Sequence, residues 1–327
     1  MTNTNTVPNS ELNVLKKEFD PLTAIALIEQ RVVRGLAKAI SFVEDGGPDK
    51  ATIMEYAYKK KSASTLVIGI TGPGGAGKST LVGQMISYYR SQGKTVGVIA
   101  VDPSSPYTGG AFLGDRVRMS THNSDNGVFI RSFGTRNSLG GISEAVKGAL
   151  YLYKAFHFDI IIVESIGVGQ DQTEIDSFVD VTAVLFVPGF GDSIQMAKAG
   201  IKEVADVFII NKADKPEALI LKEQMMNSFG IMPEESRPPV VCTIANAGKG
   251  IDEAVRAIEF ASTKNGMYID NKRRSRIWAE IRSSVMHDIS EKLETKMDQM
   301  VERVFSGVMT PYEAAQKIVE SIKIEEN

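Results

Sequence analysis

The chain contains 327 residues, of which 43% are hydrophobic and 24% are charged, as in an ordinary globular protein with room for two average domains. Its formal net charge of −3 provides no electrostatic basis for binding nucleic acid or an anionic membrane, and no apolar run approaches the ~18 residues of a membrane-spanning helix. From the charge and the lack of such a run we expect neither nucleic acid nor a membrane among the partners. The single cysteine, Cys242, excludes an intrachain disulfide framework, so we expect a cytoplasmic protein.

Residues 1–64 are predicted to form an N-terminal helical extension. The polar first residues, about 1–11, lack the features of a signal peptide and are expected to be disordered. The pattern is then helical from Asp20 to about Lys61. Within it, apolar residues recur at helical spacing from Ile25 to Val43, and Gly46-Gly47-Pro48 ends that stretch. We expect a small helical cap packed on the core, with a partner-binding surface as the alternative.

Short β-branched runs alternate with helical segments between residues 65 and 262. Because most of these runs are apolar at consecutive positions, they are typical of strands covered on both faces. The pattern predicts an α/β fold with a doubly wound, mostly parallel sheet, in which ligands bind at the carboxyl ends of the strands. The predicted strands cover residues 66–70, 96–101, 128–130, 160–163, 183–187, 207–210 and 240–244.

A glycine-rich segment at residues 72–80, with the sequence GPGGAGKST, follows the first predicted strand and precedes a helical pattern. It matches the phosphate-binding loop pattern G-x-x-x-x-G-K-[ST] at every fixed position. In such a loop the backbone N–H groups and the positive end of the helix dipole point at phosphate. Lys78 is predicted to reach the β- and γ-phosphates and Ser79 to bind Mg²⁺, a glycine-rich turn that matches by chance being the alternative. The residues expected to contact the nucleotide are Gly74, Gly75, Ala76, Gly77, Lys78, Ser79 and Thr80.

Acidic residues near the ends of predicted strands form, with Ser79, the candidate metal site. Asp102 and Glu164 each end a strand, and Asp115 lies between them in the sequence. Carboxylates at the ends of adjacent parallel strands converge near a phosphate loop, where Mg²⁺ takes few carboxylates besides phosphate oxygens and water. Alternatively, Asp102 and Asp115 are turn or cap residues. Gly167 offers an N–H to the γ-phosphate, and Gln170 either orients the attacking water or is a surface residue.

The four residues Asn211-Lys212-Ala213-Asp214 follow the predicted strand 207–210 and indicate which base the bound nucleotide carries. The carboxylate of Asp214 can accept hydrogen bonds from the ring N–H and amino group of guanine, donors that adenine lacks on that edge. Asn211 is expected to brace the loop, and the stem of Lys212 to lie along the base. The N–H of Ala245, in a loop after the last strand, is expected to point at the guanine carbonyl. The sequence therefore favours GTP and GDP over adenine nucleotides.

Residues 263–327 are predicted to form a C-terminal helical dimerisation segment. Its apolar stripe is too long for an ordinary capping helix, which favours pairing with a second copy over docking on the core. The segment Thr310-Pro311-Tyr312-Glu313 is typical of a capping box with proline at the first helical position. The stripe consists of Ile277, Ile281, Val285, Ile289, Leu293, Met297, Val301 and Val304.

Several motifs together resemble the MeaB/ArgK/MMAA GTPases. They are VDPSS at 101–105, TGG at 108–110, GDRVRM at 114–119, ESIGVGQ at 164–170 and PGFGDSIQ at 188–195. The resemblance covers about residues 66–258 and implies a chaperone for an adenosylcobalamin-dependent acyl-CoA mutase of the methylmalonyl-CoA mutase type. GTP hydrolysis would then gate the loading or protection of the mutase cofactor.

The resemblance also implies roles for individual residues. It assigns Arg118 and Lys198 to switch segments that respond to the mutase, and it implies a homodimer formed through the C-terminal helices. The resemblance implies the same roles in binding phosphate, magnesium and guanine for the residues named above. One departure is Asn137-Ser138, where many relatives carry Gly-His, and we interpret it as a change in fine detail.

Three other functions stay open on the sequence. A nickel or cobalt metallochaperone needs soft or imidazole ligands, and one cysteine with three scattered histidines argues against it. A small-molecule kinase would need a pocket and a base for an acceptor. A nucleotide-sensing scaffold, in which hydrolysis is incidental, would bind its partner equally well with GTP and with GDP.

Overall fold

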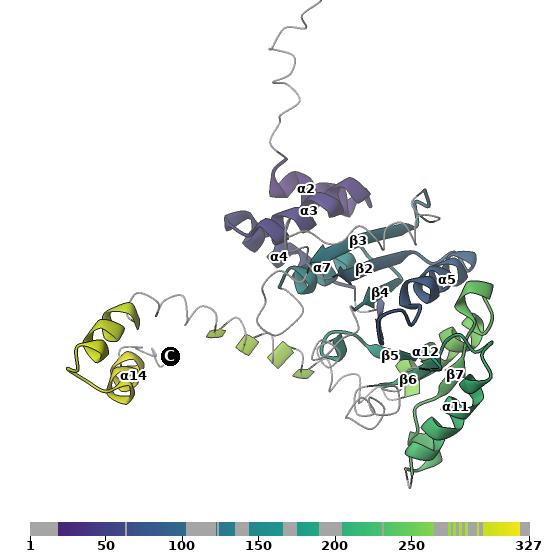
Figure 1. Ribbon diagram of the computed structural model, residues 1–327. Helices are drawn as coiled ribbons and strands as arrows, with labels where there is room; N and C mark the ends of the chain where they lie inside the picture. The colour runs from purple at the N-terminus through teal and green to yellow at the C-terminus, as the bar shows by residue number, and fades with distance from the viewer. Residues whose placement is uncertain are drawn as a thin grey trace, which may run out of the picture. The chain divides into compact units, whose positions relative to one another are not determined.

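The computed structural model describes residues 19–62, 64–102, 122, 124–134, 144–165, 175–189, 205–230 and 232–264, and in the C-terminal part residues 274–275, 277–278, 281–282, 285–286, 293 and 297–320 (Figure 1). The chain divides into two compact units, Met1–Ile269 and Asp270–Asn327. The expected disorder of residues 1–11 lies outside the described residues. None of the helices in the described part of the chain has the length and apolar content that a membrane crossing requires.

A seven-stranded sheet forms the centre of the first unit, in the spatial order β3-β2-β4-β1-β5-β6-β7. Every neighbouring pair is parallel, which confirms the predicted α/β class with a doubly wound sheet. Because β1 lies between β4 and β5, the carboxyl ends of these strands meet around the segment that follows β1. The strands are Leu66–Thr71 (β1), Val96–Asp102 (β2), Val128–Gly134 (β3), Ile160–Glu164 (β4), Val181–Phe186 (β5), Val207–Ile210 (β6) and Val240–Cys242 (β7).

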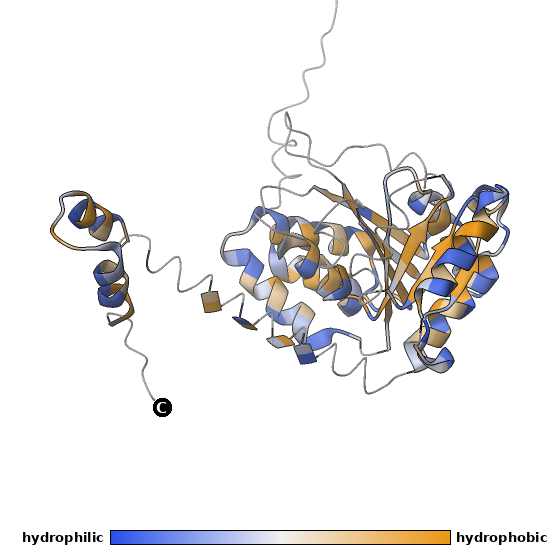
Figure 2. Ribbon diagram, turned by 60° about the horizontal axis from the view of Figure 1, so that its bottom comes forward, coloured by the Kyte–Doolittle hydropathy of each residue, from blue (hydrophilic) through white to orange (hydrophobic). Residues whose placement is uncertain are grey.

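Helices cover both faces of this sheet. Side chains alternate between the faces, so that Val67 and Ile68 of β1 belong to different core clusters. One face packs against α5 (Lys78–Ser91) and α12 (Ile251–Lys264), and the other against α7 (Glu144–Ala155) and α11 (Glu217–Ser228). In Figure 2 the strands are largely hydrophobic, and hydrophilic residues follow the outer sides of the helices.

The N-terminal helices α2 (Pro21–Glu29), α3 (Val33–Asp45) and α4 (Pro48–Lys60) share a core cluster with α7. Asp20 caps α2, because its Oδ1 accepts a hydrogen bond from the N–H of Thr23 at 2.7 Å. Arg31 has a positive φ of 59° and donates through Nη1 to the carbonyls of Phe156 at 2.5 Å and His157 at 3.0 Å. The cap is therefore joined to the end of α7 by polar contacts as well as by apolar packing.

Most strands differ from the predicted ranges by one or two residues or more, and for two strands the reason is identifiable. β3 continues past the predicted end at Ile130, because an edge strand accommodates polar side chains and Arg131 forms an ion pair with Glu44 of α3. β7 ends at Cys242 instead of residue 244. The next residue, Thr243, directs its hydroxyl to Asn211 at 3.1 Å and so leaves the pattern of a buried apolar strand.

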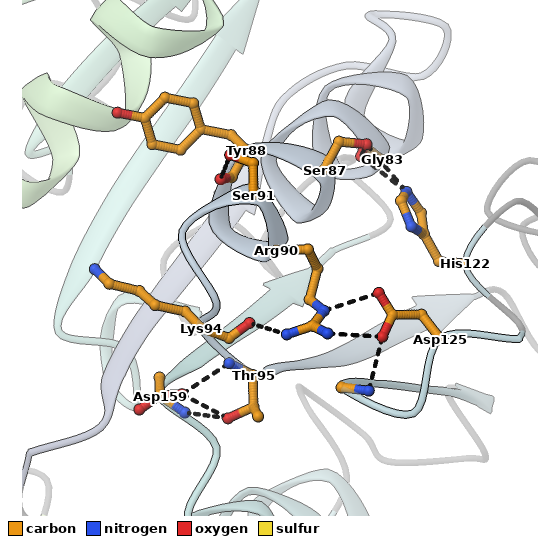
Figure 3. A network of polar contacts seen from close by, with 11 residues as sticks. Gly83, Ser87, Tyr88, Arg90, Ser91, Lys94, Thr95, His122, Asp125 and Asp159 are labelled. Atoms are coloured by element: carbon orange, nitrogen blue, oxygen red, sulfur yellow. Dashed lines mark hydrogen bonds and ion pairs between the residues drawn. The ribbon is translucent and has the colours of Figure 1, made fainter.

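A polar network anchors α5 to the turn that precedes β3 (Figure 3). The guanidinium of Arg90 donates to both carboxylate oxygens of Asp125, at 2.8 and 2.9 Å, and to the carbonyl of Lys94 at 2.8 Å. These Arg90 hydrogen bonds, together with one from the N–H of Gly127, hold the pKa of the Asp125 carboxyl below its usual value. The helix that begins at the phosphate loop is thus fixed at its far end to the β2–β3 side of the sheet.

The second unit contains the last described helix, α14 (Pro311–Glu320). The N–H of Thr310 donates to Glu313 Oε2 at 2.8 Å, and the N–H of Glu313 donates to Thr310 Oγ1 at 3.2 Å. These reciprocal bonds confirm the predicted capping box, with Pro311 as the first helical residue. The N–H of Thr310, and also its hydroxyl at 3.1 Å, donate to Glu313 Oε2, and these two bonds lower the pKa of the Glu313 carboxyl because they stabilise its charged form.

Two fully buried tyrosines offer a matched test of core hydrogen bonding. Tyr153 Oη donates to the carbonyl of Val98 at 3.0 Å, whereas the hydroxyl of Tyr89 has no hydrogen-bond partner among the described residues. Burial raises the pKa of both phenols, so both are neutral. We expect Tyr153→Phe to lower the free energy of unfolding by about 1 kcal/mol. Tyr89→Phe should leave it unchanged or raise it, since it removes an unsatisfied buried group.

Urea unfolding followed by circular dichroism measures both variants against the parent chain. Equal losses of unfolding free energy in the two variants would contradict this assignment of the hydroxyls.

Candidate functional site

The loop between β1 and α5 bends through glycines whose backbone excludes larger residues. Gly72, Gly75 and Gly77 have positive φ angles of 144°, 73° and 90°. A Cβ on Gly77 would lie 2.5 Å from Asn211 Nδ2, and a Cβ on Gly72 would lie 2.5 Å from the carbonyl oxygen of Leu185. Glycine is therefore required at both ends of the loop, by backbone conformation and by close approach.

The ammonium of Lys78 lies against the carbonyls of its own loop. Its Nζ donates to the carbonyl of Gly72 at 2.9 Å and to that of Pro73 at 3.2 Å. Ala76, Lys78 and Ser79 are buried, whereas Gly74, Gly75 and Thr80 are exposed. A buried cation at a helix N-terminus, next to exposed glycine backbone, is a suitable environment for phosphate.

Ser79 and Glu164 bring a hydroxyl and a carboxylate together beside this loop. The hydroxyl of Ser79 donates to Glu164 Oε1 at 2.8 Å, and both residues are buried. Parallel pairing of β1 with β4 places Glu164 opposite Ile70, close to the start of the loop. A hydroxyl and a carboxylate beside a phosphate site suit Mg²⁺, which completes its coordination with phosphate oxygens and water. Within the described ranges no group of three or more His, Cys, Asp and Glu side chains is arranged to hold a metal.

Asn211 joins the phosphate loop to the predicted base-reading loop. Its Nδ2 donates to the carbonyl of Ala76 at 2.8 Å, while its Oδ1 accepts from Thr243 Oγ1 and from the N–H of Ala245, both at 3.1 Å. Lys212 has a positive φ of 57° and donates through Nζ to the carbonyl of Gly75 at 2.9 Å. Both side chains therefore connect the end of β6 to the phosphate loop.

The carboxylate-bearing residue of the base-reading loop, Asp214, is exposed to solvent. The backbone around it is held in place, because the N–H of Ala213 donates to the carbonyl of Thr243 at 3.0 Å. The N–H of Ala245 donates to Asn211 in this structure, and its contact with a guanine carbonyl stays a prediction.

Part of the predicted site lies outside the described residues. This applies to Asp115, Arg118, Gly167, Gln170 and Lys198. For Asp102 the structure describes the backbone, which ends β2 two positions beyond Ala100, the register partner of Glu164.

Sequence reasoning missed two polar contacts at the site. Thr243 supports Asn211, and Ser165 Oγ donates to Thr71 Oγ1 at 2.9 Å, with both hydroxyls buried. The available signal was a hydroxyl residue at the end of an otherwise apolar strand. The partner of each hydroxyl depends on which strands are neighbours, which the sequence pattern does not specify.

Comparison with known proteins relates this chain to GTPases, in agreement with the sequence motifs. A family model described as "Methylmalonyl Co-A mutase-associated GTPase MeaB" matches residues 36–298. A protein of Pyrococcus abyssi named as a GTPase is 40% identical over 303 residues, which cover 88% of this chain and 93% of that protein. GTPase ArgK of Escherichia coli is 37% identical over 232 residues, covering 68% of this chain and 70% of its own. The crystal structure of an LAO/AO transport system kinase has a TM-score of 0.68 and 25% identity, covering 94% of this chain and 98% of that chain.

The exposed Asp214 gives a test of base reading that does not disturb the fold. We expect Asp214→Asn to lower the preference for GTP over XTP by at least about a hundredfold, because xanthine presents an acceptor where guanine presents an amino donor. Competition of each nucleotide against fluorescent GDP measures this preference. Asp49→Asn, at an exposed aspartate of α4, is the matched control. An unchanged preference for GTP would mean that another residue reads the base.

Proposed function

The chain belongs to the MeaB family of methylmalonyl-CoA mutase-associated GTPases and hydrolyses GTP, and from this premise we propose that it is a chaperone for an adenosylcobalamin-dependent acyl-CoA mutase. The observation that carries the proposal is the family match over residues 36–298, whose description names the mutase. GTP hydrolysis in the cytoplasm would gate the loading of the cobalamin cofactor into the mutase or its protection there.

The base-reading loop supports guanine as the base. Asp214 would accept hydrogen bonds from the guanine ring N–H and amino group, and its exposure leaves the carboxylate accessible to a ligand. Asn211 and Lys212 are already bound to the phosphate loop, so little rearrangement is needed for one nucleotide to contact both loops. Ala245 would add a backbone contact to the guanine carbonyl.

The phosphate side of the site supports hydrolysis by positioning and charge neutralisation. Lys78 would exchange its contacts with Gly72 and Pro73 for phosphate oxygens. Ser79, Asp102, Asp115 and Glu164 would hold Mg²⁺, which supplies charge neutralisation at the β- and γ-phosphates when bound. The metal residues with described side chains, Ser79 and Glu164, support this because they already meet beside the loop.

The reaction itself needs one water molecule. Its oxygen bonds to the γ-phosphorus as the bond from that phosphorus to the bridging oxygen breaks, which leaves GDP and inorganic phosphate. We propose that Gln170 orients this water and that the N–H of Gly167 contacts the γ-phosphate. Arg118 and Lys198 are the proposed switch residues, whose cationic side chains the mutase would reposition.

The second unit supports a homodimer. Its described helical residues expose an apolar stripe in which Ile281 is 60%, Met297 51% and Val301 59% exposed. Large apolar side chains exposed in series are typical of a protein–protein interface. We propose that a second copy of the chain covers this stripe.

Stimulation by the mutase tests the chaperone proposal. We expect slow intrinsic GTP hydrolysis that rises on the order of 10³-fold with the mutase, because a repositioned cation stabilises the transition-state charge. Lys198→Ala should lose the stimulation while keeping its affinity for fluorescent GTP analogues. Phosphate release with and without purified methylmalonyl-CoA mutase measures the intrinsic and the stimulated rates of hydrolysis. A mutase that neither binds nor stimulates the parent chain would contradict the proposal, and stimulation that survives in Lys198→Ala would refute this switch residue.

The proposed interface predicts a change of mass. Ile281→Glu combined with Val301→Glu should convert a dimer into a monomer, since two charges would be buried at each copy of the stripe. Size-exclusion chromatography with light scattering measures the mass, and Glu302→Gln at a neighbouring exposed position is the control. A parent chain that is monomeric at micromolar concentration would refute the homodimer.

A further inference from the structure

Two consecutive residues at the end of β4 contact the two ends of the phosphate loop. Glu164 accepts a hydrogen bond from Ser79, which follows the loop lysine, at 2.8 Å. Ser165 donates through Oγ to Oγ1 of Thr71, the last residue before Gly72, at 2.9 Å. All four side chains are buried, with exposed fractions of 5% or less. The end of β4 is therefore joined to the loop at its start and at its end.

We propose that Thr71 and Ser165 form a positioning pair for GTP hydrolysis, which holds the Glu164 carboxylate in register with Ser79 for Mg²⁺. The inference rests on the proposed nucleotide and metal site. Neither hydroxyl belongs to the groups proposed to contact phosphate or metal. The pair acts through Glu164, whose backbone is bonded directly to that of Ser165.

The local structure explains why hydroxyls are used at this point. β1 and β4 are otherwise apolar next to the site, with Ile70 and Val163 completely buried. Glu164 is the register partner of Ile70, and the N–H of Ser165 extends the ladder by donating to the carbonyl of Ile70 at 3.0 Å. The hydroxyl contact adds a second constraint beside this backbone bond. A buried hydroxyl is costly without a partner, so the two groups restrict each other to one arrangement.

The contact between Thr71 and Ser165 matters because the hydroxyl of Ser79 takes part in two interactions. In the structure it donates to Glu164, and in the proposed complex it is a ligand of Mg²⁺. Ser79 can bind a metal through an oxygen lone pair while its O–H still donates to Glu164, but a metal held by both groups would shift them relative to each other, so this hydrogen bond alone would not fix their alignment. The contact between Thr71 and Ser165 does not involve the metal groups, so it can maintain the alignment in both states.

The opposite end of β1 provides a control. Thr65 is 3% exposed, and its Oγ1 donates to the carbonyl of Phe158 at 2.7 Å. It is the same residue type, buried and hydrogen-bonded at the end of the strand that lies away from the phosphate loop. Thr65→Val removes a comparable hydrogen bond without touching the site.

The test uses full-length Thr71→Val, Ser165→Ala, Ser165→Thr and Thr65→Val. We expect Thr71→Val and Ser165→Ala to raise the Mg²⁺ concentration for half-maximal GTP hydrolysis about tenfold and to lower kcat, the size expected for one lost hydrogen bond. Mg²⁺ should also slow the release of fluorescent GDP less in these variants than in the parent chain. The affinity for GDP in EDTA should stay within about twofold, because the loop and base contacts remain. Ser165→Thr, which keeps the hydroxyl, should restore the parent response.

These measurements distinguish a positioning role of Thr71 and Ser165 from a purely structural role. Thr65→Val is expected to lower the unfolding midpoint without altering the Mg²⁺ response. If Ser165→Ala shifts only the unfolding midpoint, as Thr65→Val does, or if its GDP affinity in EDTA falls in parallel with its Mg²⁺ response, the pair is structural and the inference is wrong. A parent chain that binds no GDP, or hydrolyses GTP equally well without Mg²⁺, refutes the proposed site itself.

Discussion

The carboxamide of Asn211 is the contact on which the arrangement of the site depends. It donates to the carbonyl of Ala76 in the phosphate loop and accepts from Thr243 and Ala245 beyond β7. One buried side chain thus fixes the distance between the segment proposed to bind phosphate and the segments proposed to read the base. The close approach also explains Gly77, because a Cβ there would overlap the amide of Asn211. Removing the amide would leave several buried polar groups without their partner at once.

Strand order provides the second constraint. β1 lies between β4 and β5, so the loop that follows β1 is flanked by the carboxyl ends of both neighbours. This adjacency brings Glu164 and Ser165 from far along the chain to opposite ends of one short loop. Parallel pairing is essential, because it places all the carboxyl ends of the strands at the same edge of the sheet.

A GTPase that reports to a partner needs a rigid part and a part whose position depends on the nucleotide. The described contacts supply the rigid part: Asn211 and Lys212 hold the phosphate loop to β6, and Arg90 holds the far end of α5. The proposed pair of Thr71 and Ser165 extends this framework to the carboxylate that would sense the metal. In the proposed switch, such a framework would give the charge of a γ-phosphate a fixed reference from which to act on the partner-responsive segments.

Local patterns alone predicted the glycine loop, the apolar strands and the NKAD segment, because each depends on a few consecutive residues and on the conformation they favour. The α/β class and the capping box at Thr310 follow from the same kind of information. The sequence did not reveal the extension of β3, which depends on its place at the edge of the sheet and on the ion pair of Arg131 with Glu44. Nor did it reveal the partners of Thr71, Ser165 and Thr243. Those contacts join segments far apart in the sequence, and only the order and register of the strands bring their hydroxyls together.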